Sequence, residues 1–396
     1  MFQRIAAISA IFLCTAFAWM ILGTTIFTRT YRQDPGLRSK VVSSWGGKHT
    51  QAAPRACYFV TEPGAGKNAK PVKTCRTVPL EGSRVEVRLN LEHRQKGLLW
   101  YSTYTVQFGA RYTFRNTSDS ARELRIEFPL PSKEAIYDDL VLQVNGRSAD
   151  AETGESRLIA HAAAAQGQTA EVSVSYRSQG LEAWQYSFGG GVSRVRGFEL
   201  RALTNFAAVD FPPNTLSPTA KRRERDGWEL RWNYGNLMSG QQIGIAMPEK
   251  LQPGLLAGQI SYFAPVSLLF FFFVMFIVTT LRRIELHPMN YFFLAAAFFA
   301  FHLLLAYLVD HIDIHRAFAV ASAVSVFLVV SYLRLVTGLR FAAVEAAFSQ
   351  FLYLVLFSYA FFFRGFTGLA VTIGSIVTLF VAMQLTGRIR WGAPAS

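Results

Sequence analysis

Hydrophobic and polar positions follow two different patterns along the 396 residues of this chain. Six stretches are almost entirely apolar, one near the N-terminus and five near the C-terminus, whereas the residues between the first two mix apolar and charged positions. A bilayer core of about 30 Å requires about 20 apolar residues in a helix, so we predict six membrane-spanning helices. These stretches are residues 5–27, 262–281, 291–309, 317–333, 341–363 and 365–385.

The long segment between the first two stretches, residues 28–261, shows the alternation of half-buried β-strands. In RVEVRLNLEH, Val85, Val87 and Leu89 alternate with charged or polar residues, and EVSVSYR and WELRWNY repeat this pattern. Asn-Gly and Pro-Pro-Asn turn signals separate the runs, which predicts an antiparallel β-sandwich of one or two sheets. The alanine-rich IAHAAAAQ (159–166) is an exception, for which we expect a helical turn or a linker.

These patterns predict an α-helical membrane protein with a large β-domain inserted after its first helix. We expect an N-terminal transmembrane anchor (1–27), a periplasmic β-rich domain (28–261), a five-helix transmembrane bundle (262–390) and a cytoplasmic tail (391–396). The first stretch also resembles a cleaved signal peptide, but its apolar part is longer than a signal core of about 7–15 residues. We therefore expect an uncleaved anchor.

The distribution of arginines predicts the orientation of the spans. With the N-terminus in the cytoplasm, the short inner segments carry seven arginines and the short outer loops carry only two, Arg316 and Arg364. This positive-inside asymmetry places both termini in the cytoplasm and residues 28–261 outside it. We predict a multi-pass protein of a bacterial inner membrane, with the β-domain in the periplasm. The seven inner arginines are Arg4, Arg282, Arg283, Arg334, Arg340, Arg388 and Arg390.

The β-rich segment carries most of the excess positive charge. Residues 28–261 contain 31 lysines and arginines against 22 aspartates and glutamates, a net of +9 out of +14 for the chain. Outside the inner membrane such a charge favours anionic lipid, a cell-wall polymer or an acidic protein as partner, and it argues against nucleic acid. The densest basic run is either a docking patch or a solvated loop, and consists of Lys221, Arg222, Arg223 and Arg225.

Two of the three cysteines lie in the β-rich segment, where an oxidising compartment is expected. We therefore predict a disulfide between Cys57 and Cys75. Cys14 lies within the first apolar stretch and is expected to remain unpaired.

Three ionisable residues lie within or at the edge of the apolar stretches, where such groups are expensive and often functional. His302 lies in the middle of its stretch. It is either a structural residue that hydrogen-bonds to a neighbouring helix or part of a polar pathway. For Glu345 the sequence leaves two alternatives, an ion pair with Arg340 or Arg334 at the membrane interface or a proton relay. His287 precedes Pro288, which is expected to begin a helix. His287 is therefore either a structural hinge or a residue that contacts lipid phosphate.

A polar cluster, DHIDIHR (310–316), joins the third and fourth stretches. Asp310, His311, Asp313 and His315 offer metal ligands, and two histidines four residues apart share one face of a helix. The alternative is a polar turn at the membrane surface, in which Asp310 and Arg316 cap the neighbouring helix ends. Both alternatives remain open from the sequence, although we predict a polar turn and no bound metal.

Familiar catalytic motifs are absent from the sequence. It contains neither G-x-S-x-G nor H-E-x-x-H, and TEPGAGKN (61–68) lacks both the first glycine and the final Ser or Thr of a phosphate-binding loop. We therefore expect no cofactor, no catalytic residue and no enzymatic activity.

Several stretches resemble the inner-membrane CreD family. They are VVSSWGGKHTQAAP (41–54), after the first span, and LHPMNYFFLAAAFFAFHLLLAYLVDHI (286–312), together with the order of anchor, periplasmic β-domain and helical bundle. The resemblance implies a role in envelope integrity, envelope stress and colicin tolerance, without a cofactor. The cysteine-flanked insertion at 57–75 departs from the family pattern. A shorter stretch, residues 110–146, is similar to a vault/inter-alpha-trypsin-type β-domain.

Through the CreD resemblance, Ser44, Trp45, Gly46 and Gly47 become candidate binding residues, although Trp45 is also suited to an interfacial anchor. We predict a non-enzymatic envelope protein whose β-domain binds a periplasmic protein, lipid or cell-wall polymer. One alternative is a transporter or transporter subunit that uses His302 and the 310–315 cluster. A further alternative is a membrane-embedded enzyme with a metal held by His311 and His315.

Overall fold

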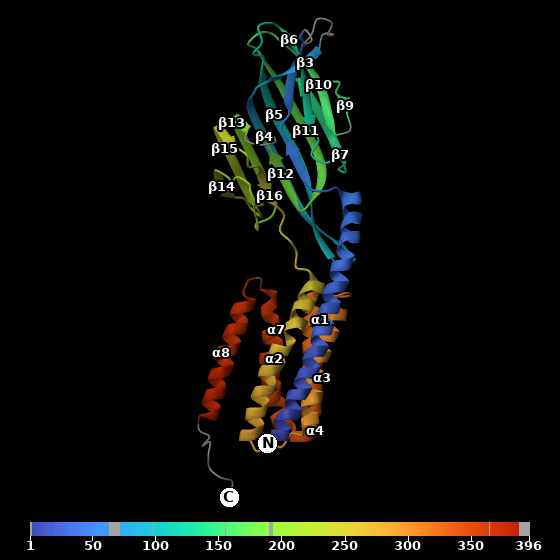
Figure 1. The fold of residues 1–396 in the computed structure, drawn as a ribbon, viewed down its shortest axis with the longest axis vertical. Coiled ribbons are helices and arrows are strands. Elements are labelled where there is room, and N and C mark those ends of the chain that lie inside the picture. The colour runs from blue at the N-terminus through green and yellow to red at the C-terminus, as the bar shows by residue number, and fades with distance from the viewer. Residues whose placement is uncertain are drawn as a thin grey trace. The chain divides into compact units, whose positions relative to one another are not determined.

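The computed structural model describes residues 2–62, 72–97, 99–154, 156–189, 193–363 and 365–387. The chain forms two compact units. The membrane unit consists of Met1–Pro35 and Leu251–Ser396, and the β unit consists of Gly36–Lys250. Six helical segments within the described ranges are long and apolar enough to cross a membrane. One unit is helical and the other is rich in strands, which agrees with the predicted combination of membrane helices and a β-domain (Figure 1).

Long helices form the membrane unit, although the end of the first one, from Gly36 onward, belongs to the β unit. They are α1 (Phe2–Trp45), α2 (Pro253–Leu281), α3 (Pro288–Leu308), α4 (Ile314–Thr337) and α8 (Thr367–Thr386), with a composite helical segment between α4 and α8. The first helix continues well past the predicted end of the anchor at residue 27, through the polar sequence up to Trp45. The difference arises because apolar composition marks the part of a helix that suits a bilayer, and a helix can continue into water.

The composite segment spans Leu339–Phe362 and changes its helical type several times. Two π-helical turns interrupt the α-helix on either side of Gln350. π-Helical turns are rare in proteins overall, and those that do occur are often found at functional sites. The pieces are α5 (Leu339–Phe341), the π-helix η1 (Ala342–Ala346), α6 (Ala347–Gln350), the π-helix η2 (Phe351–Leu356), α7 (Phe357–Tyr359) and the 3₁₀-helix η3 (Ala360–Phe362).

The β unit contains three sheets. Their strand orders are β14-β15-β13-β4-β5-β11-β7-β8, β3-β2-β6-β10-β9 and β1-β12-β16. The strands are β1 (His49–Ala52), β2 (Arg55–Glu62), β3 (Val72–Val78), β4 (Leu80–Lys96), β5 (Leu99–Arg115), β6 (Arg122–Pro129), β7 (Tyr137–Val144), β8 (Arg147–Ser148), β9 (Glu152–Thr153), β10 (Arg157–Ala164), β11 (Thr169–Leu181), β12 (Ala183–Ser187), β13 (Ser193–Thr204), β14 (Ala220–Arg223), β15 (Trp228–Ser239) and β16 (Ile243–Ala246).

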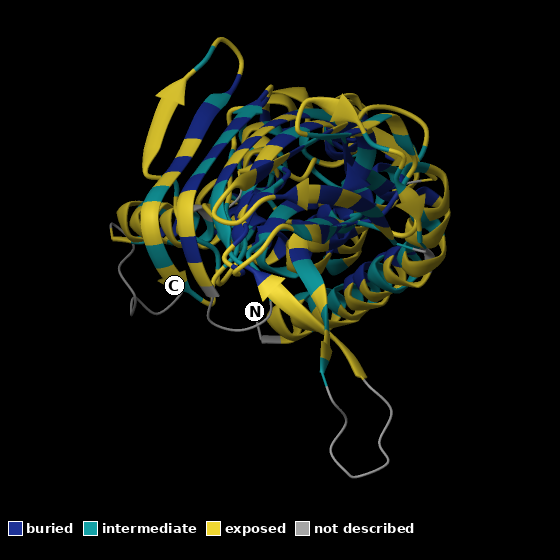
Figure 2. Ribbon diagram, turned by 90° about the horizontal axis from the view of Figure 1, so that it is seen from above, coloured by how far each residue is buried: buried dark blue, intermediate teal, exposed yellow. Residues whose placement is uncertain are grey.

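Strand pairing is mostly antiparallel, as predicted, with two exceptions. β13 pairs in parallel with β4, and β1 pairs in parallel with β12. Two neighbouring strands of 17 residues each, β4 and β5, form the centre of the eight-stranded sheet. The alternation read from the sequence appears as alternating buried and exposed residues along the strands in Figure 2. In β4, Val85, Val87 and Leu89 are buried, whereas the residues between them are exposed.

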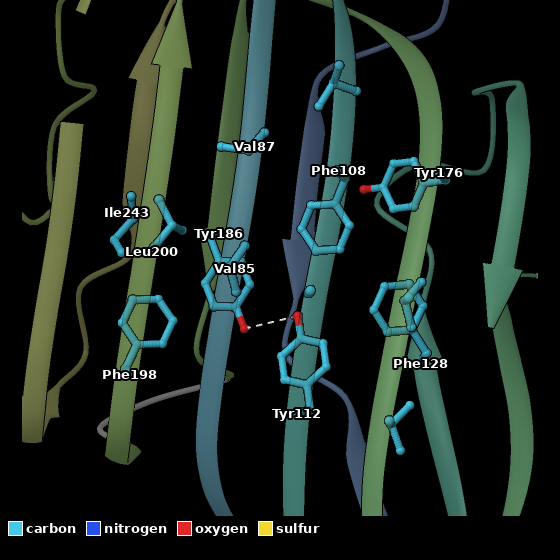
Figure 3. Close-up of a cluster of buried hydrophobic side chains, with 14 of the residues drawn as sticks. Val85, Val87, Phe108, Tyr112, Phe128, Tyr176, Tyr186, Phe198, Leu200 and Ile243 are labelled. Carbon is cyan, nitrogen blue, oxygen red and sulfur yellow. Dashed lines mark hydrogen bonds between the residues drawn. The ribbon is translucent and has the colours of Figure 1, made fainter. Parts of the chain in front are cut away.

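The core of the β unit is aromatic and aliphatic (Figure 3). The rings of Phe108 and Tyr176 stack with their centroids 4.9 Å apart, and the Tyr186 hydroxyl lies 3.4 Å from that of Tyr112. Burial raises the pKa of the Tyr112 and Tyr186 hydroxyls above the ordinary value, so both remain protonated. These residues fix the interior against which the strands pack.

The prediction for the alanine-rich stretch 159–166 was wrong, because most of it belongs to strand β10. β10 pairs antiparallel with β6, and its alanines at 160, 162 and 164 are buried while His161 is exposed. Alanine favours helices only slightly over other residues, so tertiary pairing overrides its preference.

Candidate functional site

The predicted binding loop, Ser44–Gly47, forms the end of α1 and the start of the path to β1. Gly46 has φ +98°, and a Cβ at this position would lie 2.6 Å from the Gln179 carbonyl oxygen, so only glycine fits. The Gly47 carbonyl accepts a hydrogen bond of 3.1 Å from the Leu181 N–H. The two glycines are therefore explained by the close approach of the chain to β11.

Trp45, in the same loop, is half-buried and packs near Val41 and Leu181. The Arg94 guanidinium carbon lies 3.4 Å from the centroid of the Trp45 ring, in a cation–π contact. One face of the indole is thus already covered by a side chain of β4. The structure gives Trp45 a structural contact within the β unit, which the sequence did not indicate.

The basic run Lys221–Arg225 does not form a simple solvated loop, because Lys221, Arg222 and Arg223 belong to β14 at the edge of the eight-stranded sheet. The Lys221 ammonium lies 5.2 Å from the centroid of the Trp228 ring, and the Arg223 guanidinium lies at the same distance from it. Charged residues on an edge strand discourage pairing with another chain. Arg225 follows the strand and is exposed.

Part of the basic surface is neutralised by Glu229, which is only 1% exposed. Its carboxylate contacts Arg201 at 2.5 Å, Arg231 at 2.8 Å and Arg222 at 3.3 Å. The Arg231 hydrogen bond, together with Arg201, lowers the pKa of this carboxyl despite its burial. Arg222 is therefore engaged in a structural ion-pair network.

His302 is 1% exposed within the membrane unit. Its Nδ1–H donates to the Phe298 carbonyl at 2.8 Å, one turn earlier in α3. The ring makes edge contacts with Trp19 (centroids 5.5 Å apart) and Phe301 (4.8 Å apart). These contacts fit the structural alternative, with the hydrogen-bond partner supplied by the same helix and not by a neighbouring one.

Glu345 forms an ion pair with Arg282, with an oxygen–nitrogen distance of 2.8 Å. The expected partners were Arg340 and Arg334, so the predicted pair exists with a different arginine. His287 caps α3, where its Nδ1 accepts the Met289 N–H at 3.2 Å, and Pro288 opens the helix as predicted.

Residues 310–313 of the DHIDIHR cluster lie in the short turn between α3 and α4, and residues 314–316 begin α4. Asp310 pairs with Arg29 of α1 at 3.2 Å, and Asp313 caps α4 by accepting the His315 N–H at 3.0 Å. The prediction that Asp310 and Arg316 cap the helix ends was therefore wrong, since Asp313 is the cap of α4. His311 is exposed. Among the described residues, no three His, Cys, Asp or Glu side chains converge as a metal site.

The predicted Cys57–Cys75 disulfide is present, with Cα atoms 5.6 Å apart. It joins β2 and β3, which pair antiparallel in the five-stranded sheet. Cys14 remains a free, exposed cysteine of α1. Most of the segment between the two paired cysteines, residues 63–71, lies outside the described residues.

Beside this disulfide is a cavity of about 520 Å³ that the sequence did not indicate. Its walls come from strands distant in sequence and are largely apolar. They include the buried side chains of Val78, Phe114, Tyr186 and Phe198. Small-molecule sites typically have volumes of roughly 300–1,000 Å³, so the cavity is large enough for one ligand.

The mouth of the cavity is rich in arginine. Arg55, Arg157, Arg194 and Arg196 line it and are exposed, and Glu127 is the single acidic residue among its described lining residues. Because the arginines are exposed and the aromatic rings are buried, the cavity has a cationic outer end and an apolar inner end. Alternating strands do not reveal such a site, since its residues meet only when three sheets assemble.

A second group missed from the sequence is buried around His49, which is fully buried on β1. Its ring lies edge-on to Tyr104, with the centroids 5.9 Å apart, and the Tyr104 hydroxyl donates to the Ala183 carbonyl at 2.9 Å. Burial lowers the pKa of His49 to about 4, although the nearby Gln179 backbone partly offsets this effect. His49 is thus an uncharged core residue near neutral pH.

Comparison with known families supports the predicted resemblance. Residues 228–392 match the model of a family described as inner membrane protein CreD. The match begins in β15 and extends through the helices that follow the β unit. No significant match was found among curated proteins.

Two solved structures are distantly similar to this chain. One is a protein from Legionella pneumophila described as a candidate nutrient binding protein, with 10% identity, 60% of this chain and 79% of that chain covered, and a TM-score of 0.33. The other is an M1 zinc metallopeptidase from Deinococcus radiodurans, with 11% identity, 42% of each chain covered and a TM-score of 0.24. Neither similarity is close enough to inform function.

Proposed function

We propose that this protein supports the integrity of a bacterial cell envelope from the inner membrane, and that its β unit lies outside the cytoplasm and binds an envelope component. The six helices of membrane-crossing length and the match to the inner membrane protein CreD family support the location. The excess of arginines in the short inner segments supports the orientation.

The observation that carries the proposal is the insertion of a basic β unit between two membrane-type helices. The chain enters the β unit from the membrane part of α1 and leaves it into α2. The +9 charge of residues 28–261 favours anionic partners, which the envelope offers as lipid head groups, wall polymers and acidic proteins. We propose binding and not catalysis as the activity of the unit.

Complementation tests the contribution of the β unit. A strain that lacks the gene is challenged with detergent and cell-wall antibiotics and is given either the full chain or a chain in which Gly36–Lys250 is replaced by a flexible linker. We expect only the full chain to restore tolerance when both proteins reach the membrane at equal levels. Restoration by the linker chain would contradict the proposal.

Crosslinking in intact cells identifies the bound component. A photoreactive amino acid replaces Ile136 or Met238, which are 71% and 64% exposed in the β unit, or the control residue Phe327, which is 69% exposed in the membrane unit. We expect discrete adducts from at least one β-unit position and only lipid adducts from position 327.

Transport is a second candidate function, favoured by the polar groups beside the two π-helical turns. Gln350 is fully buried, its amide donates to Ser325 at 2.8 Å, and its Oε1 makes no hydrogen bond to the described residues. Polar groups buried in membrane helices often mark pathways. If Gln350→Leu abolishes complementation while the folded protein persists, transport is favoured, whereas full complementation excludes a role for this group.

A further inference from the structure

We propose that the cavity of the β unit binds a single-chain anionic amphiphile, that is, one alkyl chain that ends in a carboxylate or phosphate. This inference rests on the proposed envelope-binding function and specifies the chemistry of one partner. It follows from three features of the cavity: an apolar interior, a cationic mouth that is only partly neutralised, and a wall fixed by a disulfide. Of the four arginines at the mouth, two form ion pairs, Arg157 with Glu127 and Arg196 with Glu81, and the other two form none with the described residues.

The interior of the cavity suits an alkyl chain. Val78, Phe114 and Phe198 are at most 2% exposed, and they present hydrocarbon to the cavity from three different strands. Tyr186 is also fully buried, and its hydroxyl is directed to Tyr112, as the dashed line in Figure 3 marks. Its polar atom is thereby already hydrogen-bonded, so the ring adds to the apolar wall.

The mouth keeps positive charge that no described group neutralises. Both oxygens of Glu127 are occupied, Oε1 by Arg125 at 3.0 Å and Oε2 by Arg157 at 2.9 Å. Arg55 lies opposite Glu127 in the β2–β6 pairing but forms no ion pair with it, and Arg194 has no ion pair within the described residues. Guanidinium groups bind carboxylate and phosphate through paired hydrogen bonds.

Together the two ends select an amphiphile. A free inorganic anion would leave the apolar wall in contact with water, and a neutral lipid would leave Arg55 and Arg194 without an anionic partner. An alkyl chain with one oxyanion satisfies both ends within about 520 Å³, whereas a two-chain phospholipid exceeds this volume. Single-chain anions of this kind arise wherever membrane lipids are broken down.

The disulfide holds two parts of the cavity wall together. β2 supplies Arg55 and β3 supplies Thr77 and Val78, and the Cys57–Cys75 bond joins the same two strands. Cys57 is paired in register with Thr77 across the hairpin. We therefore expect reduction of this bond to loosen the wall and weaken binding.

Photolabelling of the full chain tests the proposal. The protein is placed in nanodiscs of neutral phosphatidylcholine and irradiated with a diazirine-bearing fatty acid of 14 carbons, and the adducts are mapped by mass spectrometry. We expect adducts on peptides that contain Val78, Phe114 or Phe188, in addition to those on membrane helices. Dodecyl phosphate should compete for the cavity adducts, dodecanol should not, and the alcohol analogue of the probe should not label the cavity.

Matched variants separate the cavity from general surface charge. Arg55→Gln/Arg194→Gln should lower the yield of cavity adducts about tenfold, the size expected from the loss of charge-assisted hydrogen bonds. Arg88→Gln/Arg115→Gln removes the same charge from exposed positions elsewhere and should leave the yield unchanged. Ala53→Trp, which fills the cavity, should also remove the adducts while the arginines remain, with the fold checked by circular dichroism.

Adducts confined to the membrane helices, labelling of the cavity by the alcohol analogue, or equal losses in the two double-arginine variants would each overturn the assignment. The outcome is separable from that of the proposed function. If the cavity is not labelled but the linker chain still fails to complement, the ligand assignment is wrong and the envelope-binding proposal stands.

Discussion

The β unit and the membrane unit place their large apolar side chains in opposite ways. Among the described residues, 38 exposed large hydrophobic side chains belong to the membrane unit and five to the β unit. The β unit instead exposes charged residues that form cross-strand ion pairs, such as Arg84–Glu199 and Arg111–Glu171. Water drives the burial of apolar side chains in the β unit. A bilayer is itself apolar, so phenylalanines that face lipid need no burial.

The two units also treat buried polar groups differently. In the membrane unit these groups are mostly small and bond to backbone, as when Ser325 donates to the Ala297 carbonyl at 2.7 Å. In the β unit a buried carboxylate, Glu229, is retained because three arginines surround it. The comparison indicates that packing and short hydrogen bonds hold the buried groups of the membrane unit in place. In the β unit, ion pairs contribute as well.

The largest expected effect contrasts one buried ring with one lipid-exposed ring. Phe108→Ala removes a ring that is 3% exposed and should lower the free energy of unfolding of the β unit by about 3–5 kcal/mol. Phe327→Ala removes a ring that is 69% exposed and should change the stability of the membrane unit by less than about 1 kcal/mol. Denaturation of both variants in the same detergent measures the contrast, and equal losses would contradict it.

A pH effect is expected in the β unit. The pKa of His49 is about 4 in the folded protein, below its ordinary value of 6.5, so the unfolded chain takes up a proton first as the pH falls. The stability of the unit should therefore decline by about 3 kcal/mol between pH 6.5 and pH 4. His49→Gln should show a smaller decline in pH-dependent unfolding, whereas the exposed His161→Gln should behave as the parent protein.

An intermediate effect should distinguish Asp313 from His311 in the turn between α3 and α4. Asp313→Ala removes the N-cap of α4 and should destabilise the membrane unit by about 1 kcal/mol, whereas His311→Ala should have an effect within about 0.5 kcal/mol. Addition of zinc or a chelator should not shift the thermal midpoint of either variant. A zinc-dependent shift that His311→Ala abolishes would establish a metal site instead of a polar turn.

The smallest effect should occur at the sheet edge of the β unit. Lys221→Ala removes cation–π contacts with Phe211 and Trp228 and should cost about 0.5–1 kcal/mol, while Arg225→Ala should be neutral within measurement. Chemical denaturation compares the two. A larger tendency of the Lys221→Ala protein to self-associate would show that the charge also protects the edge strand.

The sequence patterns predicted which parts of the chain are helical and which are rich in strands, because each pattern reflects the solvent that surrounds the element, water or lipid. Alternation in β4 and long apolar runs such as 291–309 both follow from local chemistry. Local chemistry also explains Pro288 at the start of α3 and the disulfide between Cys57 and Cys75. The end of α1 was missed because polar residues continue a helix without an apolar signal.

The candidate sites were harder to predict because they depend on contacts between distant segments. Arg282 pairs with Glu345 across 63 positions, and Arg94 of β4 covers Trp45 at the end of α1. The cavity needs Arg55 and Arg194 at one mouth, although neither belongs to a motif. His49 looks ordinary in sequence, and only its burial on β1 gives it an altered pKa.

The central claim is that the β unit lies outside the cytoplasm, and cysteine labelling in intact cells tests it most directly. In a Cys14→Ser background, single cysteines at the exposed positions Met238, His311 and Glu285 are treated with a maleimide that cannot cross the inner membrane. We predict that the cysteines at 238 and 311 react in intact cells, and that the cysteine at 285 reacts only after the membrane is disrupted. Labelling at 285 with protection at 238 would contradict the account.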